Sequence, residues 1–361
     1  MTNLRIAVIG AGHLGRIHSK LLGSVDGASL VGISDPVESA RARASEMFSV
    51  PVVEDYRELI DSIDAAVIAS PTDSHAEIAT ELLKAGKHLL VEKPLAISSS
   101  DSDRLVMLAN SKQLTLQVGH VERFNPAFTA LGQLGVDTKY VEAVRASRFP
   151  GRCLDVGVVM DLMIHDIDLV CSMTDTAVKS VSASGLAVVS DHEDLAEARI
   201  EFECGLVANL KASRVSPTPA RSMQVFGPSG FAEIDFSGPA LHTVQTSDLL
   251  VDRQFDLEDA TDNPLGYADE LFTDHLKIGT QELEPRNAIL DELHDFVISI
   301  QSGIAPTVSG ADGARAVTIA ERILDSISEH AWYQDATPSE IGALANARTR
   351  IEAKPRLRKV A

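Results

Sequence analysis

The chain has 361 residues, enough for two domains with a core in each, and it carries 52 acidic against 32 basic side chains, for a formal charge of −20. This charge argues against nucleic acid and anionic membranes as partners, because such a surface would be repelled by both. Three cysteines lack the CxxC spacing of a zinc motif, the N-terminus lacks a signal-peptide layout, and no apolar run reaches the roughly 18 residues of a membrane span, so we expect a cytoplasmic protein.

A nucleotide-binding pattern opens the chain. The apolar run at residues 4–9 is typical of a strand buried on both faces, and a GxGxxG motif and then a helical pattern follow it directly. In that setting the first glycine allows a tight turn, the second a close approach to a pyrophosphate, and the third close packing of helix on strand. The loop residues predicted to contact the dinucleotide are Gly10, Gly12, His13, Leu14 and Gly15.

An acidic residue ends the second predicted strand, at residues 29–34. This residue, Asp35, lies 20 residues after Gly15. A carboxylate in this position can accept hydrogen bonds from the adenosine ribose and would repel a 2′-phosphate. We therefore predict NAD as the cofactor, with NADP as the less favoured alternative. Arg41 and Arg43 are expected to be solvated.

Strands and helices continue to alternate through the first third of the chain, which predicts a parallel, doubly wound sheet. The strand at residues 64–69 ends in a polar turn, and Asp73 or Ser74 is expected to cap the following helix at residues 76–85. A nicotinamide would lie near this edge of the sheet, although a helix-start histidine without a ligand explains His75 equally well. The turn residues predicted to contact the cofactor are Ser70, Pro71, Thr72 and His75.

A lysine follows the strand predicted at residues 87–91. Pro94 cannot continue a central strand and holds Lys93 in an extended conformation at the edge where ligands bind. Glu92 would support the ammonium electrostatically, and both Glu92 and Lys93 are predicted cofactor contacts. The alternative is a surface ammonium at a strand end. The glycine motif before it and an Asp/His group after it favour a functional lysine.

Basic residues in the second part of the chain are candidates for binding an anionic substrate. Arg123 lies in a polar loop at residues 119–126, and Arg148 and Arg152 lie in a turn-rich segment farther along. With Lys93 they could supply the local positive charge that a strongly acidic protein needs for such a ligand. Ordinary surface arginines are the alternative.

An apolar helix predicted at residues 157–173 carries three ionisable side chains. Asp161 and His165 are four residues apart and share a face, which Asp168 continues. Removal of a proton from an alcohol while hydride leaves its carbon requires a base that titrates near neutral pH, and a histidine oriented by a carboxylate serves. A satisfied core His–Asp pair is one alternative. A metal site is a weaker one, because no second histidine or cysteine falls at ligand spacing, and we predict no metal.

The remaining chain predicts an antiparallel sheet and two closing helices. Residues 178–246 read as consecutive strands with one face on the preceding helix, and residues 248–274 as an acidic excursion. Helices are predicted at residues 287–301 and 311–328. The predicted divisions are a Rossmann domain at 1–122, a substrate-binding and dimerisation α/β domain at 123–335 whose final helices pack back on the first domain, and a basic tail at 336–361.

Together these motifs resemble the glucose–fructose oxidoreductase / inositol dehydrogenase / MocA-type family over about residues 1–335. The resemblance implies a Rossmann domain followed by an α/β domain with a large, mostly antiparallel open sheet that often forms a dimer interface. It also implies that Lys93, Asp161 and His165 form the catalytic set. The loop at residues 119–126 is similar to family members that oxidise the 3-hydroxyl of UDP-N-acetylglucosamine or related UDP-sugars, which adds Glu122 and Asn125 to the candidate substrate contacts. The motifs that carry the resemblance are the glycine loop, Ser70-Pro71-Thr72 with His75, Glu92-Lys93-Pro94, Asp161 with His165, and the segment 303–316.

We interpret the chain as an NAD-dependent dehydrogenase of a sugar hydroxyl, with a UDP-N-acetylhexosamine as the favoured substrate. His165 would take the hydroxyl proton, Lys93 would bind that oxygen and Asp161 would orient both, although either His165 or Lys93 could accept the proton. The alternatives are a free-sugar or inositol dehydrogenase with the same residues, and a non-catalytic NAD-binding regulator. A homodimer or homotetramer is expected. The predicted substrate contacts are Lys93, Glu122, Arg123, Asn125, Arg148, Arg152, Asp161 and His165.

Overall fold

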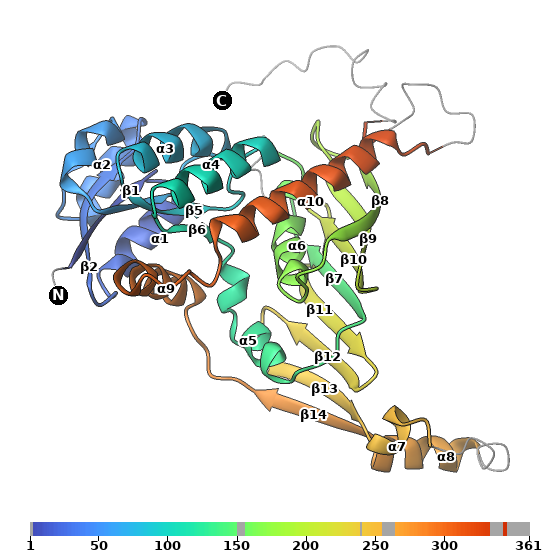
Figure 1. Cartoon of the computed structure of the whole chain (residues 1–361). Coiled ribbons are helices and arrows are strands. Elements are labelled where there is room, and N and C mark those ends of the chain that lie inside the picture. Colours follow the sequence, from blue (N-terminus) through green and yellow to red (C-terminus); the bar gives the residue numbers. More distant parts are fainter. Residues whose placement is uncertain (1–2, 150–155, 239, 255–263, 333–341, 345–361) are drawn as a thin grey trace.

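The structure is a computed structural model that describes residues 3–149, 156–238, 240–254, 264–332 and 342–344. These residues form one sheet of six strands and one of eight, and α10 (Gly310–Glu329) lies against both parts of the molecule (Figure 1). The basic tail predicted at residues 336–361 lies outside the described residues except for 342–344. In the parts of the chain that the structure describes, no helix combines the length and apolar character needed to cross a bilayer.

The six-stranded sheet is parallel and has the strand order β3-β2-β1-β4-β5-β6, which confirms the predicted doubly wound sheet. Helices α1 and α9 pack on one face and α3 and α4 on the other, so the central strands are apolar on both sides. The strands are β1 (Leu4–Ile9), β2 (Ala28–Ser34), β3 (Val52–Val53), β4 (Ala65–Ile68), β5 (His88–Glu92) and β6 (Leu116–Gly119). The helices of this part are α1 (His13–Leu22), α2 (Glu38–Met47), η1 (Tyr56–Ser62), α3 (Thr72–Lys84), α4 (Ser99–Ser111) and α9 (Ala288–Ser302).

Helix α3 begins four residues earlier than expected, at Thr72. Its N-cap residue is Pro71, which makes no side-chain cap. The hydroxyl of Ser74 instead bonds to Ser70 and to the carbonyl oxygen of Pro71. The expectation that Asp73 or Ser74 caps the helix is therefore wrong, because the extended proline ends the turn and both residues lie inside the first helical turn.

The eight-stranded sheet has the order β14-β13-β12-β11-β7-β10-β9-β8, and its pairs are antiparallel except for β7 with β10. Helices α5, α6 and α10 pack on one face and form the larger core with it. The strands are β7 (Tyr140–Ala146), β8 (Val178–Leu186), β9 (Leu195–Phe202), β10 (Val207–Ser213), β11 (Ala220–Gly227), β12 (Gly230–Asp235), β13 (Ala240–Thr246) and β14 (Leu276–Glu282). The remaining helices are η2 (Val121–Phe124), α5 (Pro126–Gln133), η3 (Val159–Met163), α6 (Ile164–Cys171), α7 (Asp248–Val251), α8 (Pro264–Glu270) and η5 (Leu271–His275).

Strand β14 at the sheet edge was not expected from the sequence. It pairs antiparallel with β13 along residues 276–282, where only Leu276 and Ile278 are apolar. The acidic excursion expected before it contains the short helices α7, α8 and η5 among its described residues. An edge strand with one open side needs little apolar alternation, so its pattern is weak.

Candidate active site

The glycine loop between β1 and α1 is shaped by close backbone contacts. Gly10 has a φ of +101°, and a Cβ there would lie 2.6 Å from the carbonyl oxygen of Ala69. A Cβ at Gly15 would lie 1.8 Å from the oxygen of Gly10, whereas one at Gly12 would meet nothing within 4 Å. The first and third glycines are therefore required by packing, and the second leaves open space over the loop, as a pyrophosphate site requires.

Asp35, at the end of β2, is bonded to this loop. Its Oδ2 accepts a hydrogen bond from the Ala11 N–H at 2.7 Å, and its Oδ1 accepts one from the Val37 N–H at 2.8 Å. Arg41, expected to be solvated, donates to the carbonyl oxygen of Asp35 and pairs with Glu54 at 3.0 Å. The other two predicted loop contacts, His13 and Leu14, are exposed in the first turn of α1.

His75 is buried between the ends of two strands. Its Nδ1 lies 2.9 Å from the carbonyl oxygen of Pro94 and its Nε2 lies 2.9 Å from that of Ser70. Burial lowers the pKa of His75, and a neutral ring can donate to only one of these oxygens. The geometry corresponds to the structural alternative for this histidine, and Thr72 is the residue of this turn that lines an adjacent cavity.

Lys93 reaches across to the second part of the chain. Its Nζ donates to the carbonyl oxygen of Asp161 at 2.6 Å and lies 3.2 Å from the Asp161 Oδ1, with both side chains largely buried. Two residues separated by 68 positions are thus brought together at the junction of the two sheets. Of the two groups that Asp161 was expected to orient, the ammonium of Lys93 is the one with which it is in contact.

The turn that carries Asp161 is not α-helical. Residues 159–163 form a π-helical turn, η3, and α6 starts only at Ile164. A π turn closes with hydrogen bonds between residues five apart, one residue more than in an α turn, and such turns are frequent at functional sites. The expectation of one continuous α-helix over residues 157–173 is therefore wrong at this turn.

His165, in the first turn of α6, is held neutral by its surroundings. Burial, followed by the positive charges of Lys93 and Arg145, keeps the pKa of His165 well below its usual value. Its Nδ1 is buried without a hydrogen-bond partner among the described residues. A neutral imidazole with a free ring nitrogen can accept a proton, which is what a general base requires.

A network of buried ion pairs lies behind α6. Arg145 donates to Glu122 at 2.8 Å and to both oxygens of Asp166 at 3.1 and 2.8 Å. Arg123 donates to Asp168 at 2.8 Å. Asp168, expected to extend the catalytic face, and Glu122 and Arg123, expected to contact substrate, are thus engaged in ion pairs within the protein.

The other predicted substrate contacts are also accounted for where the structure describes them. The Asn125 side chain caps α5 by accepting the Ala127 N–H at 3.0 Å. Arg148 donates to the carbonyl oxygen of Pro217 at 3.1 Å. Arg152 lies outside the described residues.

The sequence analysis did not identify His120 as a candidate site residue. Its ring is fully buried, stands edge-on to that of His165 with the centroids 6.2 Å apart, and has no partner on either nitrogen in the described structure. Burial lowers the pKa of His120. The available signal was its position just after a predicted strand end, the same signal that identified Lys93.

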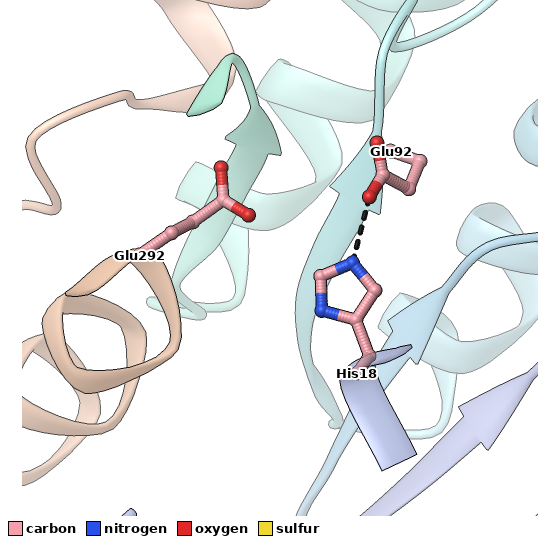
Figure 2. A group of neighbouring side chains, drawn as sticks. All are labelled: His18, Glu92 and Glu292. Atoms are coloured by element: carbon pink, nitrogen blue, oxygen red, sulfur yellow. Dashed lines mark hydrogen bonds and ion pairs between the residues drawn. The ribbon is translucent and has the colours of Figure 1, made fainter. Parts of the chain in front are cut away.

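Glu92, predicted to contact the cofactor, turns into the interior. Its Oε1 lies 2.7 Å from Nε2 of His18, and the carboxylate of Glu292 on α9 points toward both (Figure 2). Among the described residues, these three form the one group of three or more side chains that lie close enough together to hold a metal ion. Sequence reasoning found neither His18 nor Glu292, because they lie on different helices far apart in the chain.

A cavity of about 540 Å³ opens between the two parts of the chain, and Pro94 lines it, whereas Lys93, Asp161 and His165 do not. Thr72 and Pro94 line it from the first part of the chain, Met160 and Glu193 from the second, and Glu321 from α10. Its size suits a small ligand, and its polar lining is acidic.

Comparison with known proteins places both parts of the chain. Residues 4–120 match the family model described as "Oxidoreductase family, NAD-binding Rossmann fold", and residues 137–233 match the GFO/IDH/MocA C-terminal domain. The chain is 37% identical to UDP-N-acetylglucosamine 3-dehydrogenase of Acidithiobacillus ferrooxidans over 243 residues, which covers 67% of this chain and 77% of that one.

Two further comparisons cover nearly the whole chain. A solved structure of UDP-N-acetylglucosamine 3-dehydrogenase from the same organism matches with a TM-score of 0.79 and 31% identity, over 90% of this chain and 98% of that one. Myo-inositol 2-dehydrogenase of Thermotoga maritima is 28% identical over 346 residues, which covers 90% of this chain and 97% of that one.

Proposed function

The chain belongs to the GFO/IDH/MocA oxidoreductase family, and on this basis we propose that it transfers hydride from a sugar hydroxyl to NAD, with the 3-hydroxyl of a UDP-N-acetylhexosamine as substrate. The contact between Lys93 and Asp161, beside a histidine kept neutral, is the observation that carries the proposal. It sets a hydrogen-bond donor and a proton acceptor at the edge of the sheet where the cofactor domain ends.

The residues of the first domain fit a dinucleotide. Gly12 leaves space for the pyrophosphate, the N-terminus of α1 would attract its charge, and Asp35 would bind the ribose. Arg41 is already paired with Glu54, which supports NAD over NADP because a 2′-phosphate would need a free cation. When bound, NAD supplies the hydride acceptor.

Three side chains would handle the substrate hydroxyl. Lys93, fixed by Asp161, would donate a hydrogen bond to the hydroxyl oxygen and stabilise the negative charge that develops there. His165 would accept the proton, since its lowered pKa leaves it unprotonated at neutral pH. Thr72, His75 and Glu92 would act mainly by shaping the site around Lys93.

The choice of substrate rests on the relatives and on the cavity. The UDP-sugar proposal is supported by the 37% identical dehydrogenase named for UDP-N-acetylglucosamine. A free-sugar or inositol dehydrogenase is the second candidate, because Asp168 already neutralises Arg123 and carboxylates line the cavity, which suits sugar hydroxyls better than a diphosphate.

A scan for NADH formation against UDP-sugars, free sugars and inositols tests these proposals. Turnover of UDP-N-acetylglucosamine without turnover of free N-acetylglucosamine would support the UDP-sugar reading, and turnover of free polyols alone would support the second candidate. NAD binding without turnover of any substrate would contradict both and favour the non-catalytic regulator. We place the reaction in the cytoplasm, since the free thiols of Cys171 and Cys204 suit a reducing compartment.

We also propose that the protein is a homodimer, with a homotetramer as the alternative. The face of the eight-stranded sheet opposite α6 carries an apolar row in register across five strands, and Ile278 at its end is 71% exposed. The first three rings of the row are in contact, with centroids 5.7 and 4.8 Å apart. The row consists of Tyr140, Phe226, Phe231, Val244 and Ile278.

Such a row is the kind of surface that a second copy covers. Ile278→Glu is expected to lower the molar mass measured by light scattering to that of the monomer. Lys277→Glu, the neighbouring exposed residue, is the matched control and is expected to leave the mass unchanged. An unchanged mass for Ile278→Glu would contradict assembly through this face.

A further inference from the structure

Three ionisable side chains from three separate elements meet where helices α1 and α9 pack on one face of the six-stranded sheet. His18 comes from α1, Glu92 from the end of β5 and Glu292 from α9, and their ligand atoms lie within 4.8 Å of one another (Figure 2). Their exposed fractions are 0%, 9% and 1%. Glu92 directly precedes Lys93 in the chain, so the cluster adjoins this lysine.

The cluster is bonded on one side only. His18 and Glu92 make a 2.7 Å contact, but the Glu292 Oε1 and the His18 Nδ1 have no hydrogen-bond partner among the residues that the structure describes. The carboxylate of Glu292 nevertheless points toward the other two side chains (Figure 2). A buried carboxylate without donors would carry a large desolvation cost if it were ionised.

The surroundings shift the pKa values of Glu92 and Glu292 in opposite directions. Burial alone would raise the pKa of Glu92, but the hydrogen bond and charge of His18 and the charge of Lys93 lower it. Burial, followed by the negative charges of Glu92 and Asp295, raises the pKa of Glu292 well above its usual value. Two carboxyl groups this close cannot both ionise cheaply, and these neighbours select Glu92 as the anion.

We infer that Glu292 carries a proton in the folded protein at neutral pH and acts as a positioning residue, which leaves Glu92 as the one negative charge of the cluster beside Lys93. An ionised Glu292 would add a second negative charge to the cluster and change the proton affinity of Lys93. The kinetic part of this inference rests on the proposed dehydrogenase function, whereas the protonation of Glu292 does not.

The proton can be detected through stability. An acid whose pKa is raised on folding stabilises most below its unfolded pKa, and this contribution is lost as pH rises through the folded pKa. Glu292→Gln keeps the shape of the side chain and removes its titration. The melting temperature of the variant is therefore expected to rise relative to that of the wild type as the pH increases from 5 to 9. The unfolding equilibrium should change by up to about tenfold per pH unit.

The exposed Glu46→Gln is the matched control and is expected to show no such divergence. A constant loss of stability in Glu292→Gln at every pH would overturn the inference, because it would mean that the ionised carboxylate of Glu292 stabilises the folded protein. So would a rise in the melting temperature of the chelator-treated wild type, but not of Glu292→Gln, on adding Zn²⁺ or Mn²⁺, since a cation would then hold the cluster. Infrared spectra should show a protonated carboxyl band that Glu292→Gln lacks.

The pH profile of NADH formation tests the link to Lys93. The wild type is expected to show a change in kcat/KM on the alkaline side that Glu292→Gln lacks. Superimposable profiles would overturn the positioning role. If neither protein turned over any sugar, the proposed function would fall, while the melting and infrared measurements would still decide whether Glu292 holds its proton.

Discussion

The ion pairs behind α6 and the polar groups around Lys93 are both buried, but they differ in how completely they are bonded. Arg145 donates to Glu122 and to both oxygens of Asp166. By contrast, His120 has no partner on either ring nitrogen, and Nδ1 of His165 has none, within the described ranges. Paired interior charges serve the fold, and unpaired polar groups mark the place where a ligand or a proton is to be received.

The largest effect on stability is expected from breaking the paired region. Arg145→Met would leave Asp166 buried without its cation and Glu122 with Arg221 alone, 3.8 Å away, and should cost about 3–5 kcal/mol in the free energy of unfolding. Arg199→Met removes an exposed pair with Glu201 and should cost less than about 1 kcal/mol. Urea denaturation measures both. Equal losses in the two variants would contradict the contrast.

The region around Lys93 should respond most strongly in activity. Lys93→Met keeps the apolar stem but removes the donor, so kcat is expected to fall by about 100- to 1000-fold, and the melting temperature should also fall because the Asp161 carboxylate loses its partner. Lys84→Met, on the exposed side of α3, is the control. NADH formation measures the effect, and turnover within tenfold of the parent would rule out the mechanism.

The pH dependence on the acid side reports on His165. Its neutral form is the proton acceptor, and because its pKa is lowered, protonation should occur only well below pH 6.5. The rate of NADH formation is therefore expected to stay level through pH 6.5 and then to fall about tenfold per pH unit. His165→Gln should be slow and lack this fall. An inflection of the wild-type pH profile at the ordinary pKa of histidine would contradict the lowered pKa of His165, because it would mean that water surrounds the ring.

The smallest effect compares two buried histidines. His120→Phe removes no hydrogen bond and should change the free energy of unfolding by less than about 1 kcal/mol. His75→Phe removes the N–H donor to one of the carbonyl oxygens of Ser70 and Pro94, and leaving that oxygen without this partner should cost about 1–3 kcal/mol. Thermal melts separate the two, and the reverse order would show that His120 has a partner in solution.

Much of the first domain could be predicted because its signals are local. The glycine loop, the strand ends and the lysine held by Pro94 all depend on a few neighbouring residues, and the structure places them at one sheet edge. The eight-stranded sheet followed from strand alternation, except for β14, whose edge position requires only a weak pattern.

The details of the site depend on contacts that no local pattern records. Arg123 and Asp168 are 45 positions apart, and their ion pair takes up a charge that the sequence suggested for substrate. The π turn at residues 159–163 arises in an apolar segment that is equally compatible with an α-helix. Glu292 meets Glu92 only because α9 returns to the first sheet.

Helix α9 has a consequence for how the protein is made. Phe296 and Val297 of this helix pack with Val8 and Leu22 in one core, although α9 ends only at Ser302. The ribosome therefore completes all six strands of the first sheet long before it synthesises the helix that covers this face. Until α9 emerges, the nascent domain exposes an apolar surface, and a fragment ending at residue 122 would expose it permanently. Such a fragment is expected to bind chaperones or aggregate.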